Sequence, residues 1–185
     1  MLCRKSLALG AVAVALVLTA SARADLTEQL KKGTPEIKSA GPLAFAPDGV
    51  LLVGDPQAGL ILALDTGDRK ANGNDRPSVD GIDEKIAALL GTDVKQIKIV
   101  DAAVNPISGN TYLSVARGAG PDAKAVILRL DRTGKLSEFA LKDVKFDSVA
   151  LTNNAEGQKR VDAITHIAWV GPRNALRTVP LWDTV

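Results

Sequence analysis

One pattern of short apolar stretches separated by tight turns occurs twice in this chain and begins a third time. The first copy is residues 42–68, the second is residues 101–136, and the third begins at residue 163. In the first copy the apolar stretches are residues 43–46, 50–53 and 60–64. Short strands joined by turns of Gly, Pro, Asp and Asn are typical of antiparallel meanders. The sequence therefore predicts an all-β fold built from repeated antiparallel modules.

The segment between the first two copies predicts one short helix. Corresponding residues of these copies are 59 positions apart, whereas a four-stranded propeller blade takes about 40–50 residues. The helix is expected near residues 83–90, with Asp83 capping its N-terminus and Gly91 just after its end. Its buried stripe would consist of Ile86, Leu89 and Leu90.

Four motifs follow one another in the first copy: Leu43-Ala-Phe, Pro47-Asp-Gly49, Leu51-Leu-Val-Gly-Asp55 and Leu60-Ile-Leu-Ala-Leu-Asp65. In this order they resemble the repeats of NHL-type β-propellers and of the related regucalcin and gluconolactonase group. The resemblance covers residues 42–136 and the opening of the third copy. It implies β-propeller-like antiparallel blades, of which about two and a fraction are present. The second copy departs from the pattern, because Arg117 stands where the first copy has Asp55.

These patterns divide the chain into three parts. Residues 1–24 are expected to be a signal peptide, residues 25–41 a lead-in, and residues 42–185 an incomplete β-propeller domain. Within this domain the repeat units are about 42–100, 101–162 and, in part, 163–185.

The number of modules is small for a propeller. Blades close into a ring only when there are about four or more, and no second strand is expected in the third unit. We therefore expect the chain to be the N-terminal portion of a longer protein. The alternative is a short protein whose open sheet edges are completed by self-association, since uncovered edges pair readily with other strands.

The N-terminal segment has the pattern of a secretory signal peptide. Arg4 and Lys5 precede an almost entirely apolar run from Leu7 to Thr19, and Ala22-Arg23-Ala24 is a small-x-small cleavage pattern. The run is shorter than the roughly 20 residues that cross a bilayer, so no stable membrane anchor is expected after cleavage. We expect an exported protein, located in a bacterial periplasm or outside the cell.

Cysteine content and charge exclude several classes of function. Cys3 is the only cysteine and lies in the expected leader, which leaves no thiol for disulfides, a thiolate zinc site or a cysteine nucleophile. The chain has 23 Lys and Arg residues and 21 Asp and Glu residues, and three of the basic residues lie in the leader. The remainder is nearly neutral, so no nucleic acid is expected as a partner.

A cluster of oxygen-bearing side chains follows the third strand of the first copy. It consists of Asp65, Asp68, Asn72, Asn74 and Asp75. Carboxylate and amide oxygens on a loop are the ligands that calcium prefers, so a divalent metal such as calcium is a candidate here. The spacing is not that of an EF-hand, and Arg69 and Lys70 lie among the acids. The alternative is a solvated loop whose Asp and Asn side chains bond to their own backbone.

Asp55 is the remaining candidate metal ligand. It begins the loop after a strand, and in a propeller such loops can place side chains near the opening of the central channel, the mouth of the ring. The resemblance to gluconolactonases implies that acidic and amide residues at this mouth hold a divalent cation that activates water. Further ligands would then come from other blades. The alternative is that Asp55, which precedes Pro56, simply forms a turn.

The sequence favours an exported binding protein without catalytic activity, whose ligand is an unknown protein, glycan or small molecule. His166 is the only histidine and has no catalytic partner near it in sequence, and no serine lies in a G-x-S-x-G elbow. The alternative is a metal-dependent extracytoplasmic hydrolase of lactonase type. A quinoprotein-like oxidoreductase is a third hypothesis, and the sequence establishes no cofactor.

Overall fold

The computed structural model describes residues 25–70, 78–151, 164–170 and 174–177. In these residues the chain forms antiparallel sheets and a single α-helix, so the predicted all-β class is confirmed. None of the described sheets closes on itself, and a propeller ring is not shown. No helix among the described residues is long and apolar enough to cross a membrane.

The first sheet has five strands in the order β1-β9-β4-β3-β2. Their bounds are β1 Lys31–Gly33, β2 Leu43–Phe45, β3 Val50–Asp55, β4 Leu60–Asp65 and β9 Val144–Ala150. The meander of β2, β3 and β4 was predicted from the first repeat. The other two strands come from the lead-in and from the end of the second unit, so the sheets and the sequence units do not coincide.

The second sheet has four strands in sequence order, β5-β6-β7-β8. Their bounds are β5 Ile97–Val104, β6 Thr111–Arg117, β7 Lys124–Leu130 and β8 Leu136–Glu138. A third, two-stranded sheet pairs β10 Ala168–Val170 with β11 Asn174–Arg177. The expectation that no second strand follows in the third unit is therefore wrong.

Short 3₁₀ helices join or precede several strands. Their bounds are η1 Leu26–Glu28, η2 Pro47–Gly49, η3 Val94–Gln96 and η4 Gly120–Asp122. The predicted turn at Pro47-Asp48-Gly49 forms η2, in which both Asp48 and Gly49 have positive φ angles, of 61° and 72°. Glycine adopts this region freely and aspartate tolerates it better than most residues, which explains this turn sequence.

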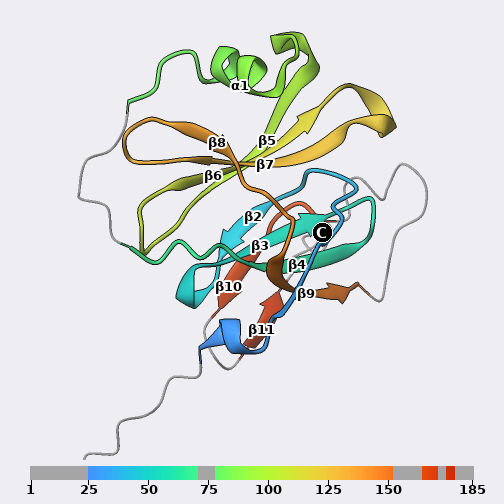
Figure 1. Ribbon diagram of the computed structural model, residues 1–185. Helices are drawn as coiled ribbons and strands as arrows, with labels where there is room; N and C mark the ends of the chain where they lie inside the picture. The colour runs from blue at the N-terminus through green and yellow to red at the C-terminus, as the bar shows by residue number, and fades with distance from the viewer. Residues whose placement is uncertain (1–24, 71–77, 152–163, 171–173, 178–185) are drawn as a thin grey trace, which may run out of the picture.

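The elements stack in layers, and α1 (Ile82–Leu90), the second sheet, the first sheet and the β10–β11 pair follow from top to bottom in Figure 1. Leu51, Leu64 and Tyr112 belong to the core between the two main sheets. Ile164 and Ile167 cover the opposite face of the first sheet. Because β3 lies between these two cores, all its residues are buried, which explains why the run from Val50 to Val53 is continuously apolar rather than alternating.

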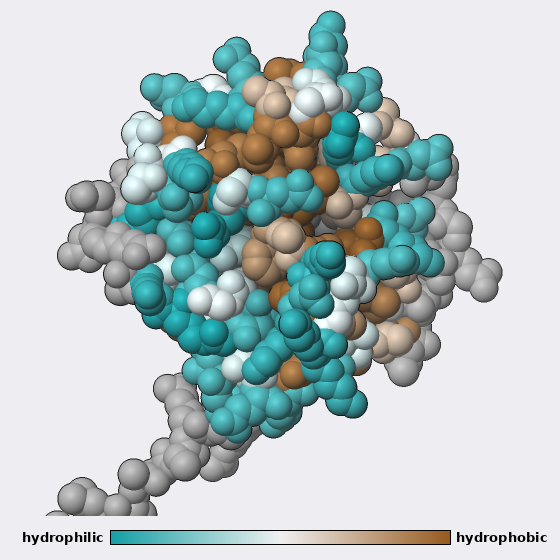
Figure 2. Space-filling view, viewed as in Figure 1, coloured by the Kyte–Doolittle hydropathy of each residue, from teal (hydrophilic) through white to brown (hydrophobic). Residues whose placement is uncertain are grey.

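Helix α1 covers the outer face of the second sheet. Ile86 and Leu90 are buried there against Leu113 and Leu128, as predicted, whereas the prediction for Leu89 is wrong because this side chain is 44% exposed. Figure 2 shows apolar side chains gathered between the helix and the strands of this sheet. The N-cap position is Gly81, and no side chain caps it, so the prediction for Asp83 is wrong; Gly91 ends the helix in the left-handed conformation, as expected.

Candidate functional site

A groove with a volume of about 480 Å³ lies between the two main sheets. One wall is formed by Ser39, Ala40, Pro56 and Gln57, which precede β2 or follow β3. The opposite wall is formed by Ile97, Lys98, Val100 and Ala116 of β5 and β6. The β6–β7 connection contributes Gly118, Ala119, Gly120 and Ala123, and Lys95 of η3 completes the lining. We call this cavity the inter-sheet groove.

Asp55 holds the first wall of the groove in place. Its side chain is fully buried. Its oxygens accept four hydrogen bonds, from the Lys38 amide (2.6 Å), the Ser39 amide (3.1 Å), the Ser39 hydroxyl (2.8 Å) and the Ala58 amide (2.9 Å). The Ser39 hydroxyl in turn accepts a hydrogen bond from the Gln57 amide at 2.9 Å. Asp55 therefore ties the segment before β2 to the β3–β4 turn.

The β6–β7 connection is fixed by backbone contacts. The amide of Gly118 donates to the carbonyl oxygen of Gln96 at 2.7 Å, which joins this connection to η3. Gly118 and Gly120 have φ angles of 99° and 72°, a region that residues with a Cβ atom rarely adopt. The β3–β4 turn and the β6–β7 connection, which contribute to the lining, both lie at the right of Figure 1.

The charge of the groove comes from two lysines. Lys95 and Lys98 are exposed, and no Asp or Glu side chain is part of the groove's described lining. Neither lysine forms an ion pair with another described residue. Asp93, two residues before Lys95, accepts the Lys95 amide and so caps η3. The groove therefore combines an apolar surface with positive charge at one side.

A second polar centre surrounds Asp68, at the opposite end of the β3–β4 hairpin. One oxygen of its carboxylate, Oδ2, accepts hydrogen bonds from Ser108 Oγ (2.8 Å), Asn110 Nδ2 (2.8 Å) and the Tyr112 hydroxyl (3.2 Å). Its backbone carbonyl accepts a further bond from Asn105 Nδ2 at 2.8 Å. Asp68 thus joins the loop after the first sheet to the β5–β6 turn of the second.

A cavity of about 380 Å³ lies beside this centre, and its lining includes Arg69, Lys70, Arg129 and Asp131. Asn110 also lines it and is only 2% exposed. The Oδ1 atom of Asn110 has no hydrogen-bond partner among the described residues. The lining carries charges of both signs, so it does not select a ligand of one charge.

The environment of Tyr112 follows from the same network. Burial, and secondarily the negative charge of Asp68, raise the pKa of the Tyr112 hydroxyl from 10.0 to about 12. Phe45 and Phe139 pack edge-on against its ring, with centroids 5.3 and 5.8 Å away. Tyr112 is therefore held neutral as a core residue of the interface between the sheets.

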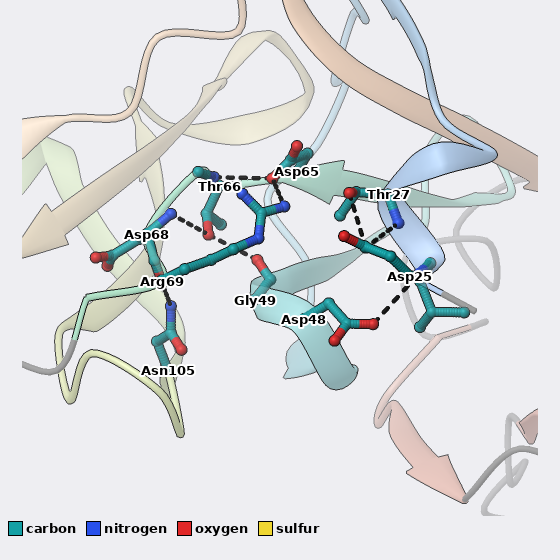
Figure 3. A network of polar contacts seen from close by, with 11 residues as sticks. Asp25, Thr27, Asp48, Gly49, Asp65, Thr66, Asp68, Arg69 and Asn105 are labelled. Carbon is teal, nitrogen blue, oxygen red and sulfur yellow. Dashed lines mark hydrogen bonds and ion pairs between the residues drawn. The ribbon is translucent and has the colours of Figure 1, made fainter. Parts of the chain in front are cut away.

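The predicted metal ligands do not all lie together. Val50 pairs with Asp65 and Asp55 pairs with Leu60, so the two aspartates are at opposite ends of the β3–β4 hairpin and cannot bind one ion. Figure 3 shows Asp65 beside Arg69, and its Oδ1 accepts the Arg69 guanidinium at 2.7 Å. The remaining predicted ligands, Asn72, Asn74 and Asp75, lie outside the described residues.

Across the part of the chain that the structure describes, no three His, Cys, Asp or Glu side chains come together in a way that would hold a metal ion. Several of the described carboxylates accept hydrogen bonds within the protein, as Asp25 does from the Thr27 amide and hydroxyl. These two bonds lower the pKa of Asp25 below 3.8. The calcium site stays a prediction.

Two further residues considered from the sequence are exposed. Arg117 ends β6 and pairs with Ile97 and Lys124, and it is not part of the groove lining. His166 lies between the buried Ile164 and Ile167 and points away from their core. Neither side chain forms a described ion pair.

The sequence did not identify Ser39, Lys95 and Lys98 as parts of a site. They lie in the lead-in and in the strand before the second repeat, which the repeat pattern leaves unassigned. Comparison with protein-family models, curated proteins and solved structures found no match for this chain. The resemblance to NHL-type and gluconolactonase-group repeats therefore stays a prediction, and the site must be interpreted from its own geometry.

Proposed function

We propose that this chain is an exported binding protein that takes a small ligand into the inter-sheet groove. The observation that carries the proposal is the groove itself, whose volume of about 480 Å³ falls within the range of ligand sites, roughly 300–1,000 Å³. Such sites combine a mostly apolar lining with a few placed polar groups. Ile97 and Val100 supply apolar surface to this groove. Its polar groups come from Ser39, Gln57, Lys95 and Lys98.

The walls of the groove support this proposal because hydrogen bonds within the protein hold them in shape. Asp55 fixes one wall through four hydrogen bonds, and the Gly118–Gln96 bond fixes the other. A site with its shape already formed loses less conformational entropy when it binds. The face-to-face packing of the two sheets suits a propeller-like scaffold. The alternative to a binding protein is a metal-dependent hydrolase of lactonase type.

The groove is tested with 1-anilinonaphthalene-8-sulfonate, a dye whose fluorescence rises in apolar sites. We expect saturable binding that Ala119→Trp removes, because a large side chain at this position fills the groove. Ala88→Trp, on the exposed face of α1, is the matched control and should bind like the parent protein. Equal dye binding by both variants, with unchanged circular dichroism, would place the dye elsewhere and reject the proposal.

Export is tested separately by fusing residues 1–30 to alkaline phosphatase lacking its own leader, since this enzyme is active only outside the cytoplasm. The expected result is activity in the periplasm of a bacterial host. Val14→Arg, which interrupts the apolar run, should abolish it. Activity that does not depend on residue 14 would argue against a signal peptide.

A further inference from the structure

We infer that the ligand of the inter-sheet groove is an amphipathic anion, a molecule with an apolar body and one carboxylate, sulfonate or phosphate group. This inference rests on the proposed function and specifies its ligand. It is carried by charge complementarity, since the described lining of the groove holds two lysines and no acidic side chain.

The position of Lys98 directs its charge toward the groove. Lys98 pairs with Ala116 across β5 and β6, and paired residues of antiparallel strands project from the same face of a sheet. Ala116 lines the groove, so Lys98 lies on the groove side of the second sheet. Lys95 lines the same cavity from η3, which directly precedes β5. Two lysine side chains therefore line the same cavity.

The backbone of β5 leaves this part of the wall uncovered. The pairing of β5 with β6 shifts register between Ile99 and Asp101, which makes Val100 the extra residue of a β-bulge. Lys98, Ile99 and Val100 are consecutively exposed, although neighbouring residues of a regular strand point to opposite faces. Lys98 and Val100 are two positions apart on β5 and both line the groove, so a lysine and an apolar side chain lie together there.

The apolar and charged parts of the lining act on different parts of a ligand. Val100, Ala119 and Ala123 offer surface to a hydrocarbon body, whose transfer from water is favourable in proportion to the area covered. An ammonium group beside such a surface attracts an anion more strongly than one in bulk water, because the local dielectric constant is lower. A cationic ligand with the same hydrocarbon body would also gain from covering apolar surface, but the lysines would repel its charge.

The test is calorimetric titration of the purified protein with octanoate, octan-1-ol and octyltrimethylammonium, which share one chain and differ in charge. We expect octanoate to bind about tenfold more tightly than octan-1-ol, as a hydrogen bond to a charged group implies, and octyltrimethylammonium to bind most weakly. The Lys95→Met/Lys98→Met double variant should remove the preference for octanoate. Lys135→Met, an exposed lysine in the β7–β8 turn, should retain it.

The outcomes separate the inference from the function on which it rests. Equal affinity for octanoate and octan-1-ol, lost in Ala119→Trp, would leave the groove as a binding site and overturn the anionic ligand. A preference for octanoate that Lys135→Met removes as well would also overturn it. Absence of any binding that Ala119→Trp weakens would reject the proposed function itself.

Discussion

Asp55 Oδ1 lies 2.8 Å from the hydroxyl oxygen of Ser39, which donates a hydrogen bond to it. The bond connects the end of β3 to the segment before β2, and the same hydroxyl accepts the Gln57 amide. Ser39 and Gln57 both line the inter-sheet groove, whereas Asp55 does not. A buried carboxylate thus sets the shape of a site that it does not itself touch.

Asp55→Ala leaves four donors without their acceptor, two of them on Ser39. These bonds are partly buried, and a hydrogen bond to a charged group contributes about 1.5–3 kcal/mol, although not additively, so we expect the free energy of unfolding to fall by about 3 kcal/mol or more. Urea denaturation measures this loss. Asp147→Ala, at an exposed position of β9, should change stability by less than about 0.5 kcal/mol. Similar losses in both variants would contradict the role of Asp55.

Asp68 is expected to be the main polar link between the two main sheets. Asp68→Ala removes the acceptor of Ser108, Asn110 and Tyr112, and should lower the free energy of unfolding by about 3 kcal/mol. Ser108→Ala removes one of these bonds and should cost about 1 kcal/mol. Because both changes break the same contact, the double variant should cost less than the sum, which a double-mutant cycle measures. Strict additivity would contradict the link.

The pKa of Tyr112 gives a direct spectroscopic test of the same interface. Tyr112 is the only tyrosine in the chain, so absorbance near 295 nm should report one phenol titrating at about 12 rather than 10.0. The raised pKa means that the neutral phenol favours the folded state. Its contribution to stability is complete below pH 10.0 and is lost as the pH rises toward about 12.

Asp68→Asn should lower the pKa of Tyr112, because it removes the negative charge beside the hydroxyl. Burial should still keep the pKa above 10.0. Asp147→Asn, on the exposed side of β9, should leave the pKa unchanged. A Tyr112 that titrates near 10.0 in the folded parent protein would contradict its burial between the sheets.

The strands that the sequence predicted are those with partners close by in the chain. The hairpins β2–β3–β4 and β6–β7 carry their own turn residues, so apolar stretches and turns were enough to locate them. Strand β9 alternates between buried and exposed positions at Val144, Lys145 and Phe146, but its partners are β1 and β4. Pairing between segments this far apart depends on the packing of the whole molecule, which no local pattern specifies.

The same distinction applies to the polar residues. The sequence indicated both Asp55 and Asp68 as candidate metal ligands. It did not predict the protein groups that donate hydrogen bonds to them. Three of the four bonds to Asp55 come from the lead-in. The side-chain partners of Asp68 lie in the β5–β6 turn and at the start of β6, 40 to 44 residues away. Asn105 and Asn110 gave no signal of their contact with Asp68, because a sequence shows which side chains can accept or donate but not which ones meet.

Strand β5 is the edge of the second sheet on which we expect a second copy of the chain to associate. It is eight residues long, and its exposed residues include Ile99, Val100 and Val104, the last of them 58% exposed. Long apolar edge strands offer unpaired backbone groups to other strands. We expect sedimentation velocity to show association that rises with concentration and that Val104→Lys reduces, since an edge lysine opposes pairing. Leu89→Lys removes a comparably exposed apolar side chain from α1, and should leave association unchanged. An equal reduction by both variants would indicate general hydrophobic contact rather than pairing along β5.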